Sequence, residues 1–388
     1  MRDLLGRELR ANPAYELVLW DRLAPEERHA LDLLPRDPDF YGVLRPRSAE
    51  GPAAALGVKA VDRDTALLFL TLREAGPLPA YVRSALGEAA GRTIARLIAD
   101  GVLEIERAGA FLCGPAALQV RETLANGGRL AGLSIAALRY GQALATDDPL
   151  RLSFRLYGYN RRPLTPRWQR LLAGPEAVQA HLGIAPGGAN RKLLDRTWRS
   201  SPPSEAWLSW HSRADEPAAD PRGATWKLYI SPAPEALAEG FGAVLEALAA
   251  ARAGQFKIGA GAAGLLRPDK IVAYFPSFER LEEAARAVEP RLAGAPAQGV
   301  PFTSEIAGDG LLSWGMDPPA AERDPWGGRE SWRLWLTHRL ARALLAARNV
   351  GENAGEEIEP WRWAVERLRL EGIDPDTWTP AASQWGGR

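Results

Sequence analysis

Only five of the 48 basic residues in this chain are lysine, and three of the five fall within one stretch, 226–275. That stretch reads WKLYIS, a helix-like segment, QFKIG, a glycine-rich turn and then LLRPDKIVAYF. Its lysines are Lys227, Lys257 and Lys270. Arginine supplies nearly every other cation. A lysine in an apolar run therefore indicates a need for a compact amine that can lose its proton, which a guanidinium cannot do.

Alternation of apolar and polar residues predicts that this stretch contains strands whose lysines share one face of a sheet. The opposite face would be apolar and would pack on helices. The predicted cationic floor consists of Lys227, Tyr229, Lys257, Lys270 and Arg267. Such a floor suits an anionic substrate. The alternative is that these side chains lie on the wet face of an antiparallel sheet with their charged ends in water.

Length and composition limit the class of protein. The chain has 388 residues, enough for two or three domains, and its 46% hydrophobic and 25% charged residues are typical of a globular protein. Its zero net charge argues against a general nucleic-acid or membrane-surface binder. Cys113 is the single cysteine, so no disulfide within the chain and no cysteine zinc cluster can form.

The N-terminus is charged throughout, and no apolar run approaches membrane-spanning length. We therefore expect a cytoplasmic protein without a membrane partner. The four histidines have no metal-ligand spacing, so we expect no metal, and no motif demands a cofactor.

The pattern predicts an α+β fold in three parts. Residues 1–60 read as a helical segment, with two helices before residue 35 and the second beginning near Pro25. Residues 61–150 read as a winged-helix-like domain: helix, linker, helix, helix and a two-stranded wing over VLEIE and AFLC. Its last helix offers few cations and the wing carries two glutamates, so peptide docking or a structural role is favoured over DNA binding.

Residues 151–388 form the third predicted part, a mixed and mainly antiparallel sheet with flanking helices. Beyond the lysine stretch, strands are expected at RLSFRLY from residue 151, at WLSWHS over 207–212, and at GVPFTSEI and GLLSWGMD. Long amphipathic helices are expected over 331–348 and 361–372.

Two motifs have competing interpretations. The glycines from Gly259 to Gly264 fit GxGxxG, but a dinucleotide site requires a helix opening there, and a strand-like run follows instead. A glycine-rich hairpin whose amides approach a phosphate fits better. His338 is either an ordinary surface or core histidine or, beside Arg339, a proton-transfer group at a phosphate site.

Over residues 200–350 the sequence resembles the HopA-type effector-like lyases of class V lanthipeptide synthesis, which are related to phosphothreonine lyases. The resemblance rests on a Lys-x-Tyr strand (Lys227, Tyr229), the strand with Lys257, Arg267 and Asp269 before the apolar strand Ile271 to Phe275, a Pro-Phe-Thr strand (Pro301 to Thr303), and His338 with Arg339. The sequence departs from the family in its long glycine-rich insertion before Arg267 and in the lysine after Asp269.

The resemblance implies elimination of phosphate from phosphoserine or phosphothreonine, leaving a dehydroamino acid. It implies Lys257 as the base and His338 as the acid, with the phosphate or substrate bound by Lys227, Tyr229, Arg267, Lys270 and Arg339. The expected partners are a peptide substrate with a leader and a kinase or other modifying enzyme. The weak basic character of the winged helix, which the resemblance does not cover, motivates the hypothesis that it holds the leader. Two alternatives stay open: a barrel-type prenyltransferase that uses a prenyl diphosphate, and a non-catalytic peptide-binding partner.

Overall fold

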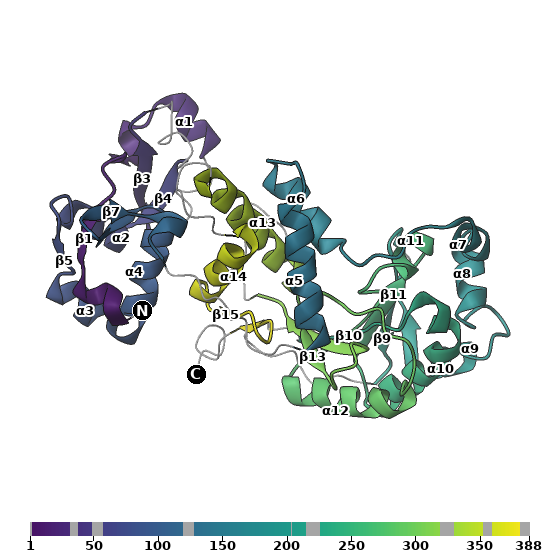
Figure 1. Cartoon of the computed structure of the whole chain (residues 1–388). Coiled ribbons are helices and arrows are strands. Elements are labelled where there is room, and N and C mark those ends of the chain that lie inside the picture. The colour runs from purple at the N-terminus through teal and green to yellow at the C-terminus, as the bar shows by residue number, and fades with distance from the viewer. Residues whose placement is uncertain are drawn as a thin grey trace. The chain divides into compact units, whose positions relative to one another are not determined.

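The computed structural model describes residues 2–31, 38–48, 57–118, 128–202, 204–214, 226–318, 330–351 and 359–380. The chain divides into two compact units, one of residues 1–122 and 342–371 and the other of residues 123–341 and 372–388. Both combine helices with antiparallel sheets (Figure 1), which confirms the predicted α+β class. The boundaries expected at residues 60 and 150 do not coincide with this division.

The first unit holds two sheets with strand orders β5-β1-β6-β7 and β2-β3-β4. Its elements are η1 (Arg2–Gly6), β1 (Glu8–Ala11), β2 (Tyr15–Leu19), η2 (Trp20–Arg22), α1 (Pro25–Ala30), β3 (Phe40–Pro46), β4 (Lys59–Asp62), α2 (Arg63–Thr71), β5 (Gly76–Pro77), α3 (Ala80–Leu86), η5 (Gly87–Ala89), α4 (Ala90–Ala99), β6 (Leu103–Arg107), β7 (Ala110–Leu112), η6 (Gly114–Ala116) and α14 (Pro360–Leu370).

The first helix expected before residue 35 is wrong, because that segment forms β1 and β2 after a short 3₁₀ turn. Both strands find partners far away in sequence: β1 pairs with β6, and β2 pairs with β3. Such long-range pairing overrides local helix preference. The second expected helix is present as α1, beginning at Pro25.

The region predicted as a winged helix has the expected series of elements, with α2, α3 and α4 followed by the hairpin β6–β7. An additional strand, β1, lies between β5 and β6 in its sheet. The amphipathic α4 buries Ile94 and Ile98, four residues apart on one face.

The second unit is built on a seven-stranded antiparallel sheet of order β13-β14-β10-β12-β11-β9-β8. Its elements are α5 (Arg129–Gln142), α6 (Pro149–Tyr157), α7 (Pro166–Leu171), α8 (Pro175–His181), α9 (Arg191–Thr197), β8 (Trp198–Ser200), β9 (Trp207–Ser212), β10 (Trp226–Ile230), α10 (Pro234–Ala250), β11 (Gln255–Gly259), α11 (Ala262–Leu265), β12 (Ile271–Phe275), α12 (Phe278–Val288), η7 (Glu289–Arg291), β13 (Ser304–Ile306), β14 (Leu312–Met316), β15 (Ile373–Asp374) and β16 (Thr379–Pro380), with the start of α13 (Trp332–Gly351).

The three lysine-bearing segments do share this sheet, as alternation predicts. β12 lies between β10 and β11. One face of the sheet is apolar, and its Leu228, Phe256 and Ala273 belong to a core with residues of α10 and α12, such as Phe241 and Leu281 (Figure 1). The opposite face carries the polar residues of the same strands, so the apolar core fixes which side chains point to the other side.

The sheet is open, with β13 and β8 at its two edges. A barrel-type prenyltransferase requires strands closed into a barrel. Within the described residues no pairing closes the sheet, so this alternative lacks its scaffold. The connection between β11 and β12 contains the short α11 rather than a dinucleotide-binding helix, and the two strands are antiparallel.

The strand expected from residue 151 is wrong, because this segment is α6. Asp148 caps the helix by accepting from the N–H groups of Leu150 and Arg151, and Pro149 occupies its first turn. Leucines alternate here, so the sequence also fits a strand. The helix buries Leu152 and Leu156, which are four residues apart.

The strand expected over Pro301 to Thr303 is a turn, and β13 begins only at Ser304. Phe302 has a positive φ of 64°, which a strand does not allow. The Phe302 N–H donates to the Ser134 hydroxyl at 2.8 Å, and Thr303 donates to the Val300 carbonyl. These side-chain contacts stabilise the turn.

None of the helices in the described ranges combines the length and hydropathy needed to span a bilayer.

Gly315 on β14 makes room for the helix that begins at Trp332. A Cβ atom at this position would overlap the fully buried Trp332 ring. We expect Gly315→Ala to destabilise the protein by about 1–3 kcal/mol through overpacking. Gly261→Ala is the matched control, because no atom lies within 4 Å of its Cβ position and its backbone is extended. Equal chemical-denaturation midpoints for the two variants would contradict this assignment.

Candidate functional site

The polar face of the seven-stranded sheet brings Lys227, Tyr229 and Lys257 together in a defined register. Tyr229 and Lys257 both pair with Val272, so the three residues form one row across β10, β12 and β11. Lys227 pairs with Tyr274 in the next row. Neighbouring strands lie about 4.8 Å apart, so Tyr229 and Lys257 flank Val272 with backbones roughly 10 Å apart.

Cations and aromatic rings alternate across this face. The Lys227 and Lys257 amines lie 5.4 and 5.5 Å from the centroid of the Tyr274 ring. Lys257 and Arg267 both lie over Trp207, at 4.2 and 4.9 Å. The rings separate like charges and supply favourable cation–π contacts.

Tyr157, at the end of α6, adds a third ring to these cation–π contacts. The guanidinium groups of Arg267 and Arg333 lie 5.4 and 4.5 Å from the centroid of the Tyr157 ring. Four cations from β10, β11, the β11–β12 connection and α13 therefore belong to one continuous cluster.

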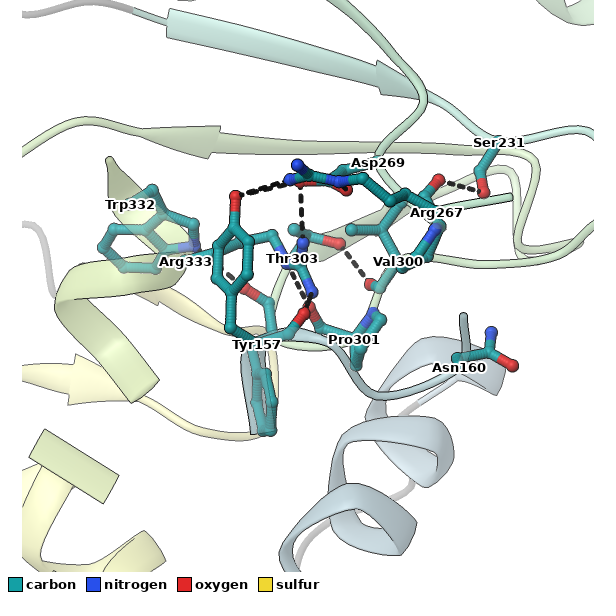
Figure 2. Close-up of polar contacts among 12 residues, drawn as sticks. Tyr157, Asn160, Ser231, Arg267, Asp269, Val300, Pro301, Thr303, Trp332 and Arg333 are labelled. Atoms are coloured by element: carbon teal, nitrogen blue, oxygen red, sulfur yellow. Dashed lines mark hydrogen bonds and ion pairs between the residues drawn. The ribbon is translucent and has the colours of Figure 1, made fainter. Parts of the chain in front are cut away.

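Asp269 is the carboxylate at which this cluster is held together. Its Oδ1 accepts from Arg267 Nε at 2.9 Å, and its Oδ2 accepts from Arg267 Nη2 at 2.8 Å and from the Tyr157 hydroxyl at 3.1 Å. Arg333 Nη1 lies 2.9 Å from the same Oδ2. Figure 2 shows Tyr157, Arg267 and Arg333 converging on this carboxylate. The two guanidinium groups hold the pKa of Asp269 well below its ordinary value.

Arg333 is fixed further by main-chain carbonyls. Its Nε donates to the Pro301 carbonyl at 3.1 Å and its Nη2 to the Tyr157 carbonyl at 2.7 Å, as Figure 2 shows. The side chain is 1% exposed. Such a buried guanidinium joins α13, α6 and the Pro301 turn.

A second carboxylate, Asp317, orients Lys227. The Lys227 amine lies 2.6 Å from Asp317 Oδ2, and both side chains are buried. The other oxygen, Oδ1, accepts from the Trp332 N–H at the start of α13 at 2.9 Å. Lys227 is therefore held in place by the same group that caps the helix.

Among the described residues, Lys257 differs from the other cations of the cluster in having no counter-charge in contact. Within the described residues its amine makes ring contacts but no hydrogen bond or ion pair. Burial, followed by the charges of Lys227 and Arg267, lowers the pKa of Lys257 to about 8. A substantial fraction of this amine is therefore neutral near physiological pH, which suits a general base.

The charges of the cluster do not cancel. Lys227 is balanced by Asp317, whereas Arg267 and Arg333 share Asp269. Among these described residues one positive charge is left over, and a second when Lys257 is protonated. A partly buried surplus of this kind attracts an anion with more than one negative charge, and guanidinium forks suit phosphate oxygens.

Lys270 lies on the same face but does not point its amine into the cluster. It is fully buried and donates to the Pro232 carbonyl at 2.8 Å and to Gln298 Oε1 at 2.7 Å. Burial lowers the pKa of Lys270 to about 7. These bonds connect the end of β10 to the loop before the Pro301 turn. The phosphate-binding role predicted for Lys270 is not supported by this geometry.

His338 and Arg339 on α13 also have other partners. The Nδ1 atom of His338 is paired with Glu330, and its ring packs edge-on against Phe154. Arg339 lies over Trp335, one turn earlier in the helix, at 3.6 Å. Neither residue shares a described contact with Lys257, Lys227 or Arg267. The contacts described for these two predicted residues therefore lie outside the cluster.

Sequence reasoning missed several members of the cluster: Tyr157, Trp207, Asp317 and Arg333. Asp317 could have been predicted from the sequence. Alternation along GLLSWGMD puts Ser313, Gly315 and Asp317 on the same face of the sheet as Lys227. Tyr157 was hidden by the incorrect strand assignment. Nothing in the sequence separates the buried Arg333 from the other arginines.

No protein-family model and no curated protein sequence matches the chain. Among solved structures it is similar to an effector protein from Pseudomonas syringae pv. tomato strain DC3000, with 12% identity, 65% of this chain and 99% of that chain covered, and a TM-score of 0.40. It is also similar to an effector from Pseudomonas syringae pv. syringae strain 61, with 15% identity, 65% of this chain and 99% of that chain covered, and a TM-score of 0.34. For the Chromobacterium violaceum VirA (SpvC) phosphothreonine lyase effector, the identity is 14%, the coverage is 50% of this chain and 99% of that chain, and the TM-score is 0.27.

Asp269→Asn tests how far the cluster depends on one carboxylate. The variant leaves Arg267 and Arg333 buried without their counter-charge, so we expect a loss of about 3–5 kcal/mol in the free energy of unfolding at pH 7. The ion pairs lower the pKa of Asp269, so this stability is present above the ordinary carboxyl value of 3.8 and is lost as pH falls below it.

The matched control is Asp195→Asn, which removes an exposed ion pair with Arg191 on α9. We expect it to cost less than about 1 kcal/mol. Urea denaturation of both variants between pH 3 and pH 7 makes the comparison. An Asp269→Asn protein as stable as the control at pH 7 would show that the cluster does not need this charge.

Proposed function

We propose that this protein eliminates phosphate from phosphoserine or phosphothreonine residues of a peptide and leaves dehydroamino acids. The observation that supports this most directly is an amine with a lowered pKa, that of Lys257, next to a surplus of fixed positive charge. β-Elimination needs both features: a base for the α-proton and cations that bind the departing phosphate.

The roles follow from the contacts. Lys257 is the base, because its amine is not engaged by an acceptor in the described residues. Lys227 and Arg267 bind the phosphate, with Asp317 and Asp269 holding them in fixed positions. Trp207 and Tyr274 line the space beside Lys257 and keep the amine in an apolar environment that favours its neutral form.

The substrate class that we propose is a ribosomally made peptide that is modified into a natural product. A phosphorylated side chain must be supplied by an upstream Ser/Thr kinase, since elimination consumes a phosphoester. This assigns the protein to the carbon–oxygen lyases that act on phosphate.

The decisive measurement is the intact mass of a synthetic phosphoserine or phosphothreonine peptide after incubation with the protein. We expect loss of the elements of phosphoric acid with wild type and at least about a 100-fold slower loss with Lys257→Arg, which keeps the charge but cannot release a proton. Lys192→Arg is the matched control, because Lys192 is exposed on α9.

The rate also depends on pH. Lys257 must be neutral to act, so kcat/KM for the wild-type enzyme should rise with pH and level off above about 8. Unchanged peptide mass with wild type would reject the lyase proposal. Unaltered activity of Lys257→Arg in a reconstituted pathway would instead favour the non-catalytic binding partner.

We further propose that the region of α2 to β7 holds the leader of the peptide. The supporting observation is a set of exposed apolar residues on α2 and α3, namely Leu67, Leu70 and Tyr81, with exposed fractions of 51%, 45% and 51%. The Tyr81 hydroxyl lies 3.2 Å from that of Thr71 on α2, which makes the set continuous. A hollow of about 430 Å³ beside it is lined by Leu78, Ala80, Arg83 and Ser84.

The pair Leu67→Glu and Leu70→Glu tests this role. We expect the double variant to bind a leader-bearing precursor peptide at least about tenfold more weakly, since charge replaces apolar contact area. Elimination from a short phosphopeptide without a leader should be unchanged. Leu171→Glu, at an exposed leucine of α7, is the control. Equal affinities by fluorescence anisotropy for all proteins would exclude leader binding at this surface.

A further inference from the structure

The proposed elimination needs a proton donor for the leaving oxygen, and the residue implied by family resemblance, His338, lies elsewhere on α13. A donor must share the face that carries Lys227 and Lys257. It must also hold a proton under conditions in which the Lys257 amine has released its own. Tyr229 on β10 meets both requirements.

The register places Tyr229 opposite the base. Tyr229 and Lys257 both pair with Val272, so they stand on either side of one small side chain in the same row of the sheet. Lys227 is two residues before Tyr229 in the same strand and on the same face, about 7 Å along the strand. The reaction requires a phosphoester held by Lys227 to present its Cα to Lys257 and its bridging oxygen to the phenol.

The ring of Tyr229 is fixed while its hydroxyl is not engaged. The ring packs in a small apolar cluster with Val272 and Val300 and is 3% exposed. Within the described residues the hydroxyl makes no hydrogen bond. The phenolic oxygen is not among the fully enclosed polar atoms of the described residues, so it is open to a ligand at the cationic face.

The charges around Tyr229 suit a donor. Burial, followed by the charge of Asp317, raises the pKa of Tyr229 well above 10, while the nearby Arg333 acts in the opposite direction. Burial lowers the pKa of Lys257 to about 8. The environment thus moves the two pKa values apart. Over a common range of pH the amine is neutral and the phenol is protonated, as a base and an acid require.

We propose that Tyr229 is the general acid of this elimination and gives its phenolic proton to the bridging oxygen of the leaving phosphate. This role rests on the proposed function. The Lys257 lone pair takes the α-proton, and the C–H electrons form the Cα=Cβ bond. The Cβ–O bond breaks with its electron pair on the phosphate oxygen, which takes the Tyr229 proton. The proton on Lys257 then returns to the phenolate through solvent, and the products are a dehydroamino acid and hydrogen phosphate.

The chemistry of the leaving group makes this donor suitable. A phosphoester dianion that loses its carbon without a proton would depart as fully deprotonated phosphate, which is a stronger base than a phenolate. A phenol can therefore protonate the departing phosphate. Sulfate is a far weaker base and leaves without a proton, so a sulfoester provides a substrate of similar shape that does not need the acid.

The experiment compares Tyr229→Phe with wild type on two peptides that differ only in carrying O-phosphoserine or O-sulfoserine. On the phosphopeptide we expect kcat to fall at least about 100-fold with little change in KM. On the sulfopeptide we expect a fall of no more than about tenfold. Lys257→Arg should lose both activities, because both substrates need the base. A purely structural role for the hydroxyl would slow both reactions equally.

Two control variants complete the set. Tyr140→Phe removes a hydroxyl from an exposed tyrosine on α5, and His338→Asn removes the rival acid. Both should keep wild-type activity on the phosphopeptide. An active His338→Asn enzyme together with a Tyr229→Phe enzyme that is slowed only on the phosphopeptide supports the proposal. Wild-type elimination that persists unchanged in Tyr229→Phe overturns it and leaves the lyase function standing.

A fluorinated tyrosine at position 229 gives a second measurement that does not depend on removing the hydroxyl. Ring fluorination lowers the pKa of the phenol, so the fluorotyrosine enzyme should lose activity at high pH where wild type does not. An identical pH profile would overturn the role of Tyr229. A wild-type protein that eliminates neither phosphate nor sulfate would overturn the proposed function and this role together.

Discussion

The buried carboxylate of Asp269 is the group on which the arrangement of the site depends. It accepts hydrogen bonds from Arg267 and Tyr157 and forms an ion pair with Arg333, so three chain segments meet at one side chain. Two guanidinium groups would not remain close together in a buried position without such a counter-charge. Because one carboxylate serves two guanidinium groups, the balance stays positive. The feature that assembles the site therefore also makes it attractive to an anion.

Register is the second constraint, and it explains how residues distant in sequence meet. Each strand of the β10–β12–β11 group buries one set of side chains against α10 and α12, so the alternate set must lie on the other face. A slip of one residue in any strand would exchange Lys227 or Lys257 for a core residue, at the cost of burying a charge. The apolar core thus specifies the polar face without contacting it.

This reasoning also shows what the sequence could predict. Alternation identified β10, β11 and β12 and assigned Lys227, Tyr229 and Lys257 to a common face, because strand period and burial are local properties. It failed for α6, where apolar residues at every second position, three leucines and Phe154, fit a strand as well as a helix. The Asp148 cap and the burial of Leu152 and Leu156 decide for the helix. It also failed for β1 and β2, whose partners lie far along the chain.

Site residues outside the strands were harder to predict, since their roles are set by tertiary contacts. Arg333 and His338 both lie in the first turns of α13, five positions apart. One helical turn takes 3.6 residues, so five positions do not return to the same side of the helix. The helix therefore presents them in different directions, with Arg333 toward Asp269 and His338 toward Glu330 and Phe154. The sequence does not show which side of α13 points to Asp269, so it favoured the histidine for its chemistry.

The contrast between Lys257 and Lys270 shows why a lowered pKa does not by itself identify a base. Burial lowers both values, to about 8 for Lys257 and about 7 for Lys270, so the pKa alone would select Lys270. Lys270 is fully buried, however, and it donates to Pro232 and Gln298. An amine in that position stabilises a loop and cannot approach a substrate without breaking those bonds. Lys257 contacts aromatic rings instead, and within the described residues no acceptor holds its amine.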